Sequence, residues 1–212
     1  MKAKVLTHNL PVFRLLESIL LTSEDGYFLL HEHMSRINAS AGYFSFPFSM
    51  SKALAMLDAF AQTLEKKSCK VRMLLAKDGR IEINAEPVKP AGPIRVALAA
   101  EPVDSANVFL YHKTTNHLVY EKAKASQPEF DDVILYNEHG EITEGSSSNI
   151  VVELKAKLFT PPVSCGLLGG TFRFSLIKTG VISERVINID ALKDCKCIYF
   201  INSVRKWREA KL

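Results

Sequence analysis

Two tight-turn sequences, each between short apolar runs, constrain the fold of this chain more than any other feature. Asp78-Gly79 and the Asn-Glu-His-Gly stretch at residues 137–140 are both typical of hairpins, because glycine supplies the positive φ that such turns require. Antiparallel sheet is therefore expected in both halves of the chain. The strand-like runs lie at residues 13–22, 27–31, 71–76, 80–85, 94–100, 133–136, 142–143, 149–154, 158–160, 186–189 and 197–204.

Apolar residues recur at helical spacing between these runs. Ser49 can cap the first turn of one such stretch, and Gly180 can end another by adopting a positive φ. The mixture of helices and antiparallel hairpins predicts an α+β fold. The helices are expected at residues 32–43, 49–67, 171–178 and 190–193.

The periodicity lapses at residues 101–106, where small and polar side chains replace the apolar pattern. A chain of 212 residues with 47% hydrophobic residues is long enough to bury one or two cores. The sequence therefore predicts two α+β lobes, residues 1–103 and residues 104–212.

The charge pattern and the apolar runs exclude several classes of partner. The formal net charge is +4 and the positive residues are spread along the chain, so no nucleic-acid footprint is expected. The apolar runs are far shorter than the roughly 20 residues needed to cross a bilayer, and no secretory segment follows Met1. Four irregularly spaced cysteines indicate neither a disulfide framework nor a metal site. We expect a soluble, cytoplasmic protein that binds neither nucleic acid nor membranes.

Lys113 lies in a polar segment directly after the apolar residues 108–110. A lysine in such a place is most often a solvated loop residue. A lysine held against apolar walls has a lowered pKa, however, and its neutral amine is the nucleophile that forms Schiff bases. The segment alone leaves both alternatives open.

Two later segments have the same ambiguity. Glu144 opens a stretch rich in glycine and serine, which is typical of a turn with a surface acid. Residues 164–173 form a glycine-rich turn before a helix, where free backbone N–H groups favour a phosphate. Neither segment is specific by itself, because such turns are common.

Taken together and in this order, five segments resemble class IV of the pyridoxal-phosphate enzymes. This family includes branched-chain aminotransferases, D-amino-acid aminotransferases and 4-amino-4-deoxychorismate lyases. The resemblance covers nearly the whole chain and implies the two-lobed α+β architecture of fold type IV, with pyridoxal 5'-phosphate held between the lobes. The matching segments are residues 13–18, the His-x-x-Arg pattern at 33–36, residues 112–116, the Glu-Gly-x-x-x-Asn-Ile pattern at 144–150, and residues 168–173.

The resemblance implies that Lys113 is the Schiff-base lysine and that Glu144 pairs with the pyridine nitrogen of the cofactor. A carboxylate there keeps the nitrogen protonated, so the ring can accept the electron pair left when a bond at the substrate carbon breaks. Lys113, once displaced by the substrate amine, becomes the base that moves the proton. Ser18 is a further catalytic candidate that could assist proton movement, although it could equally be an ordinary strand hydroxyl.

The resemblance also implies how the phosphate group of the cofactor is held. Arg36 offers a guanidinium fork that suits a phosphate, and the N–H groups of Gly170 and Thr171, together with the Thr171 hydroxyl, complete the cradle. Asn202 and Ser203 match a second phosphate-side loop and are weaker candidates.

Three positions qualify the resemblance. His33 lies one helical turn from Arg36, so we expect it to pack or orient rather than to react. His117 stands where relatives often carry arginine or tyrosine near the phenolic oxygen of the cofactor. Gly169 stands where proline is frequent.

Within the family, the compact start of the chain, residues 170–173 and residues 200–207 are most similar to the aminodeoxychorismate lyases. The implied reaction releases 4-aminobenzoate and pyruvate, a step of folate biosynthesis, and consumes no amino acceptor. An aminotransferase acting on branched-chain or D-amino acids is the alternative with the same fold. A non-catalytic, partner-binding member is the other alternative, against which the presence of Lys113, Glu144 and Arg36 argues. By analogy we expect a small-molecule substrate, a homodimer and an association with aminodeoxychorismate synthase.

Overall fold

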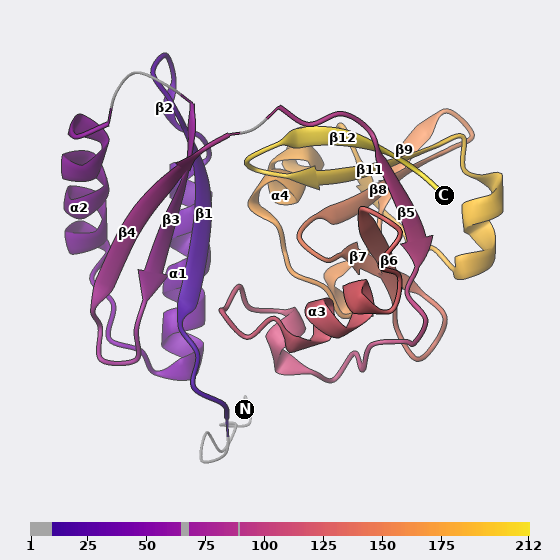
Figure 1. Ribbon diagram of the computed structural model, residues 1–212, viewed down its shortest axis with the longest axis horizontal. Coiled ribbons are helices and arrows are strands. Elements are labelled where there is room, and N and C mark those ends of the chain that lie inside the picture. The colour runs from indigo at the N-terminus through magenta and orange to yellow at the C-terminus, as the bar shows by residue number, and fades with distance from the viewer. Residues whose placement is uncertain (1–9, 65–67, 89) are drawn as a thin grey trace.

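The computed structural model describes residues 10–64, 68–88 and 90–212, which form two lobes side by side (Figure 1). The first lobe is a four-stranded antiparallel sheet in the order β2-β1-β3-β4, accompanied by two helices. Its elements are β1 (Leu15–Thr22), β2 (Gly26–Tyr27), α1 (Leu30–Phe44), α2 (Met50–Gln62), β3 (Cys69–Leu75) and β4 (Ile81–Pro87).

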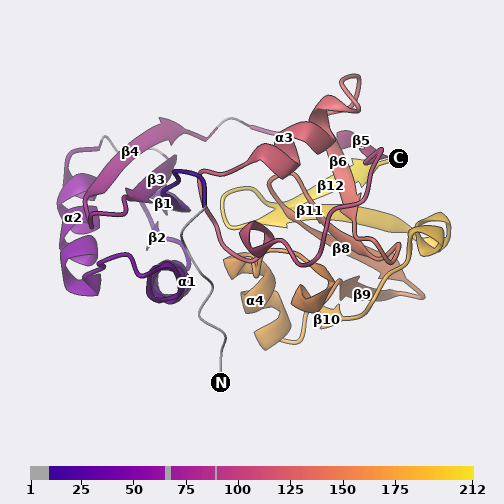
Figure 2. The same cartoon turned by 90° about the horizontal axis from the view of Figure 1, so that it is seen from below.

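Alternating side chains on β1 and β3 divide the first sheet into two faces. Leu15, Ile19 and Met73 belong to the core shared with the helices, whereas Ser18 and Arg72, which are opposite each other in the strand register, point to the second lobe. Both views place α2 on the side of this sheet away from the second lobe (Figure 2). The lobe therefore offers one sheet face for a site between the lobes.

The second lobe is an eight-stranded sheet in the order β10-β9-β8-β11-β12-β5-β6-β7, and β7 also pairs with β8. A core of apolar side chains that includes Val96, Ile150 and Phe200 fills it. Its strands are β5 (Ile94–Leu98), β6 (Asp132–Tyr136), β7 (Ile142–Gly145), β8 (Asn149–Leu154), β9 (Lys157–Thr160), β10 (Ser183–Glu184), β11 (Cys197–Asn202) and β12 (Lys206–Lys211). Its helices are α3 (Leu118–Ala125) and α4 (Thr171–Lys178), with short 3-10 turns at Val108–Leu110, Val163–Cys165 and Ile189–Asp194.

The expected turns and caps are confirmed. Gly79 and Gly140 both have positive φ at the ends of their hairpin turns, and Gly180 has positive φ just after α4. The Ser49 side chain accepts a hydrogen bond from the Lys52 N–H in the first turn of α2. These turns and caps therefore follow from the conformational preferences of the local sequence.

Two expected strands are wrong. Of the run expected at 27–31, only Tyr27 belongs to β2, which it forms with the preceding Gly26, because Leu29 adopts a left-handed conformation and α1 begins at Leu30. The strand expected at 186–189 is absent from the described chain, and β10 forms just before it at Ser183–Glu184. β12, whose residues are mostly polar, was not expected. The helix expected to reach residue 67 ends at Gln62, and residues 65–67 lie outside the described chain.

The two sheets divide at a different place from the boundary expected at residues 103 and 104. β5 pairs with β12 and β6, so it belongs to the second sheet, and the first sheet ends with β4. The expected boundary assigned this strand to the first half. An alternating apolar run shows that a strand forms but not which sheet buries it, since either neighbour satisfies the same pattern.

Candidate active site

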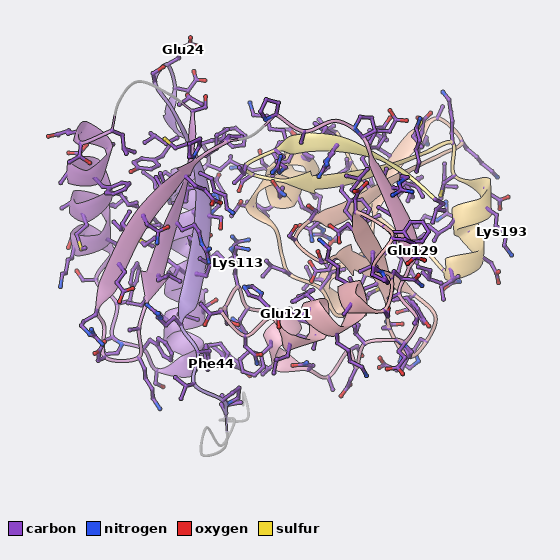
Figure 3. The ribbon with its side chains drawn as sticks, viewed as in Figure 1. Glu24, Phe44, Lys113, Glu121, Glu129 and Lys193 are labelled. Atoms are coloured by element: carbon purple, nitrogen blue, oxygen red, sulfur yellow. The ribbon has the colours of Figure 1, made fainter. Side chains whose placement is uncertain are left out.

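A cavity of about 680 Å³ lies between the lobes. Lys113 lies in this region, between the first sheet and α3 (Figure 3). The cavity collects every residue that the sequence predicted for catalysis or cofactor binding. These are Ser18, Arg36, Lys113, Glu144, Gly170, Thr171, Asn202 and Ser203.

Lys113 is held against the first lobe by main-chain hydrogen bonds. Its carbonyl accepts from the Leu16 N–H at 3.0 Å, and the Thr115 N–H donates to the Arg14 carbonyl at 2.9 Å. This segment therefore pairs with the start of β1 although it is about a hundred residues away in sequence. The side chain faces the cavity from a backbone that is fixed on both sides.

The surroundings of Lys113 make its amine a better nucleophile than an ordinary lysine. Burial and the Arg36 cation together lower the pKa of Lys113 to about 8, against the opposing effect of the Glu17 and Glu144 carboxylates. A lysine with this pKa holds an appreciable neutral fraction near neutral pH. The solvated-loop alternative is therefore disfavoured by the geometry.

Glu144 is buried at the end of β7 with 4% of its surface exposed. Its Oε1 accepts hydrogen bonds from the Tyr120 hydroxyl at 2.8 Å and from the Leu168 N–H at 3.1 Å. Burial raises the pKa of Glu144 to about 8, although both of these bonds favour the charged form. The carboxyl group lines the cavity and its hydrogen-bond donors among the described residues are neutral, so it can accept a further cationic or N–H partner.

The pattern of residues around Glu144 has a steric reason. A Cβ on Gly145 would overlap the Phe200 ring, and a Cβ on Gly170 would overlap Oδ1 of Asn149. Asn149 in turn donates to the Leu168 carbonyl at 2.8 Å. Gly145 of β7 therefore packs directly against Phe200 of β11, and Gly170 before α4 packs directly against Asn149 of β8, with no room for a side chain at either position.

Arg36 reaches the cavity from α1, but most of its fork is already engaged. Its Nε and Nη2 donate to the two carboxylate oxygens of Glu17 at 2.9 and 2.6 Å, and Nη1 donates to the Gly169 carbonyl at 3.2 Å. Burial opposes ionisation of Glu17, yet Arg36 and His33 outweigh it and hold the pKa of Glu17 at about 2. Arg36 is thus fixed beside the glycine-rich turn by a carboxylate that the sequence did not identify as a site residue.

Asn202 and Ser203 line the cavity from the loop between β11 and β12. Asn202 donates to the Ser148 hydroxyl at 3.0 Å and accepts from the Arg205 N–H at 2.8 Å, so its side chain organises a turn. The Ser203 hydroxyl donates to the Ser18 carbonyl at 3.2 Å and joins this loop to β1. The roles of Asn202, Ser203 and Ser18 in binding or catalysis stay predictions.

Several lining residues were missed from the sequence. Tyr120, seven residues after Lys113, contacts Glu144 from α3, and Arg72 enters from β3 opposite Ser18. Nε of Arg72 is buried and has no hydrogen-bond partner among the described residues. The alternation of β3 could have indicated Arg72, because Lys70 and Arg72 share the strand face away from the core.

Comparison with known proteins finds the same architecture. The family model described as amino-transferase class IV matches residues 14–212. A Schizosaccharomyces pombe protein named "Putative aminodeoxychorismate lyase" is 30% identical over 84% of this chain and 81% of its own length. The aminodeoxychorismate lyase of Saccharomyces cerevisiae is 25% identical, over 89% of this chain and 68% of the relative.

A solved structure from Mesorhizobium loti, titled "Putative amino-acid aminotransferase", superposes with a TM-score of 0.88 at 29% identity. The match covers 94% of this chain and 99% of that one. The fold expected from the sequence is therefore confirmed, and the relatives carry the names of two different activities.

Proposed function

Because the chain belongs to the class IV aminotransferase family, we propose that it is a pyridoxal-phosphate-dependent lyase that converts 4-amino-4-deoxychorismate into 4-aminobenzoate and pyruvate. One observation carries this proposal. A single cavity brings together a lysine of lowered pKa, a buried carboxyl group and an arginine beside a helix N-terminus. The names of the two yeast relatives support the lyase reaction over others of the family.

The residues present fit the cofactor. Nζ of Lys113 would hold its aldehyde carbon, and Glu144, which accepts hydrogen bonds from neutral donors, would gain a charged N–H partner from the ring nitrogen. Arg36 and the first N–H groups of α4, at Gly170 and Thr171, would hold the phosphate. When bound, pyridoxal phosphate supplies an electron-accepting ring for the pair left by a broken bond at the substrate carbon.

Proton movement in the reaction falls to this chain's own side chains. Lys113, with a pKa of about 8, takes the proton from the amine-bearing ring carbon of the substrate at its Nζ. The C–O bond to the enolpyruvyl group breaks, and a proton is returned to that group as it becomes pyruvate. The Ser18 hydroxyl lines the same cavity and is proposed to assist this return. No water or amino acceptor is consumed, so the substrate atoms divide between the two products.

The charge of the cavity wall suits a substrate with two carboxylates. Arg72 lines the cavity, and its buried Nε has no partner among the described residues. The positive charge of the Arg72 guanidinium would attract a substrate carboxylate to this wall of the cavity.

An aminotransferase is the second candidate, and the name of the Mesorhizobium loti structure favours it. It would use Lys113, Glu144 and Arg36 in the same first steps and would then need a keto acid to regenerate the cofactor.

Cytoplasmic location, the homodimer and the association with aminodeoxychorismate synthase stay predictions. No helix in the described chain is long and apolar enough to span a membrane.

A turnover experiment separates the two activities. The holoenzyme is supplied with aminodeoxychorismate alone, and 4-aminobenzoate, pyruvate and the visible absorption of the cofactor are followed, with Lys113→Ala as the control. We expect sustained and equal production of both products and recovery of the absorption when substrate is exhausted. If branched-chain or D-amino acids instead bleach the absorption once, and 2-oxoglutarate or pyruvate restores it, the protein is an aminotransferase.

A further inference from the structure

Two buried polar side chains lie behind the phosphate end of the cavity, which is the end formed by Arg36, Gly170 and Thr171. Glu17 is 1% exposed and His33 is 0% exposed, and neither is among the described residues that line the cavity. Burying a carboxylate and an imidazole costs free energy unless both are fully hydrogen-bonded. Their contacts therefore show what the pair does for the site in front of it.

Glu17 determines the orientation of Arg36. Both carboxylate oxygens take part, with Oε1 accepting from Nε and Oε2 accepting from Nη2 of Arg36. This bidentate pair leaves the other side of the guanidinium directed at the Gly169 carbonyl and the cavity. An arginine with several rotatable bonds is thereby held in one position before any ligand arrives.

Glu17 also determines the orientation of His33. Its Oε2 lies 2.6 Å from Nδ1 of His33, and because an ionised carboxylate only accepts, Nδ1 must carry a proton. The opposite ring nitrogen, Nε2, then lies 3.3 Å from Oγ1 of Thr171. The Thr171 hydroxyl can be held from behind and still donate its own hydrogen to a phosphate only if Nε2 donates to Oγ1, which requires a proton on both ring nitrogens of His33.

These contacts join the two lobes. Glu17 is on β1 and His33 and Arg36 are on α1, whereas Gly169 and Thr171 belong to the turn and first residue of α4 in the second lobe. The carboxylate is thus connected to two separate groups that face the phosphate end of the cavity.

We propose that Glu17 and His33 are positioning residues that hold Arg36 and the Thr171 hydroxyl in place for the phosphate group of the cofactor. The inference rests on the proposed function, since it assumes that pyridoxal phosphate occupies the cavity. Neither residue touches the ligand, so each acts through a neighbour. Their contribution is specific to the phosphate and absent for a ligand that lacks it.

Comparing two ligands tests this specificity. The affinities of the purified protein for pyridoxal phosphate and for pyridoxal, which lacks the phosphate, are measured by fluorescence quenching for the wild type, Glu17→Gln and His33→Gln. We expect pyridoxal phosphate to bind about tenfold more weakly to Glu17→Gln, because the neutral amide no longer aligns the guanidinium. We expect a few-fold loss for His33→Gln and unchanged pyridoxal binding for both variants.

Matched controls are available on the surface. Glu82→Gln removes an exposed carboxylate that pairs with Arg14, and His139→Gln removes an exposed histidine beside Glu138. Both controls should keep wild-type affinity for the two ligands. The phosphorus-31 NMR shift of bound pyridoxal phosphate should change in Glu17→Gln and stay unchanged in Glu82→Gln.

A double-variant cycle tests the route through Thr171. If His33 acts on the phosphate through the Thr171 hydroxyl, His33→Gln should have little further effect in a Thr171→Val background. Additive losses would show that His33 does not act through Thr171. This cycle also serves if Glu17→Gln does not fold, because it does not depend on that variant.

The outcomes separate this inference from the proposed function. Wild-type affinity for pyridoxal phosphate in Glu17→Gln would overturn the inference, and so would an equal loss for pyridoxal, which indicates a general structural defect. A wild-type protein that binds no pyridoxal phosphate would instead overturn the proposed function.

Discussion

Two buried glutamates, Glu144 in the cavity wall and Glu17 behind the wall, have pKa values shifted in opposite directions. Glu17, behind the phosphate end, is 1% exposed and has a pKa of about 2. Glu144, at the end next to α3, is 4% exposed and has a pKa of about 8. Burial raises the pKa of both carboxyl groups, so burial does not explain the difference.

The difference comes from the charge of the hydrogen-bond donors. Glu17 accepts from the Arg36 cation and from His33, whereas Glu144 accepts from a tyrosine hydroxyl and a backbone N–H. A cation compensates the lost hydration of a carboxylate and a neutral donor does so only in part. At the phosphate end, the carboxylate charge of Glu17 is thus already paired with a cation of the protein. At the other end, Glu144 gains a charged partner only when a cationic ligand binds.

Lys113 lies between these ends, and its replacement should have the largest effect. Lys113→Ala removes the amine and the proton carrier together, so turnover should fall by at least about 10³-fold. In the wild type, borohydride should attach a pyridoxyl group to Lys113, as peptide mapping can show. Lys122→Ala, which removes an exposed partner of Glu101, is the control and should stay active. A label on Lys122 or Lys124 would place the site elsewhere.

Glu144→Gln tests whether the Glu144 carboxylate pairs with a charged group of the ligand. An amide cannot keep the ring nitrogen protonated, so kcat should fall by roughly 10²-fold while the cofactor stays bound. Glu153→Gln, at a surface ion pair with Lys196, should keep wild-type kinetics. Single-turnover kinetics measure the chemical step directly, and an unchanged rate constant would show that Glu144 does not contact the ring.

Arg36→Ala tests the phosphate end of the cavity. This change should weaken cofactor binding rather than slow the chemical step. Loss of a charge-assisted contact should weaken binding of pyridoxal phosphate by about 1.5–3 kcal/mol, with kcat largely restored at saturating cofactor. Arg14→Ala, which removes an exposed cation, is the control. Equilibrium dialysis gives the affinities. If they are equal, the turn before α4 holds the phosphate alone.

The smallest effect is on the stability of the cofactor-free protein, and its sign should differ between the two ends. The folded pKa of Glu17 lies below the usual 4.5, so its stabilisation is present above pH 4.5 and is lost as the pH falls towards 2. The folded pKa of Glu144 lies above 4.5, so its contribution is complete below pH 4.5 and is lost as the pH rises through 8.

At pH 7, Glu17→Gln should therefore lower the melting temperature and Glu144→Gln should raise it. Each change should be about 1–3 kcal/mol, or roughly 2–10 °C for a chain of this size. Scanning calorimetry from pH 3 to pH 8 measures both variants, and the deficit of Glu17→Gln should shrink as the pH falls below 4.5. Shifts of the same sign in both variants would contradict the comparison.

The sequence by itself determined the features that depend on neighbouring residues. The hairpin turns, the cap at Ser49 and the start of α4 follow from local conformational preferences. The candidates Lys113, Glu144 and Arg36 were found because each lies in a short pattern that is contiguous in sequence. All three line one cavity, as the resemblance implied.

Only the tertiary structure decided which distant groups meet. The sheet that receives β5, the contact between Tyr120 and Glu144, and the path from Glu17 through His33 to Thr171 join residues up to 138 positions apart. The local sequence around a glutamate in an apolar strand does not show whether a cation or a neutral donor will face its carboxylate. Its charge state is decided by the partner that packing brings within hydrogen-bond distance, which is why Glu17 and Glu144 differ.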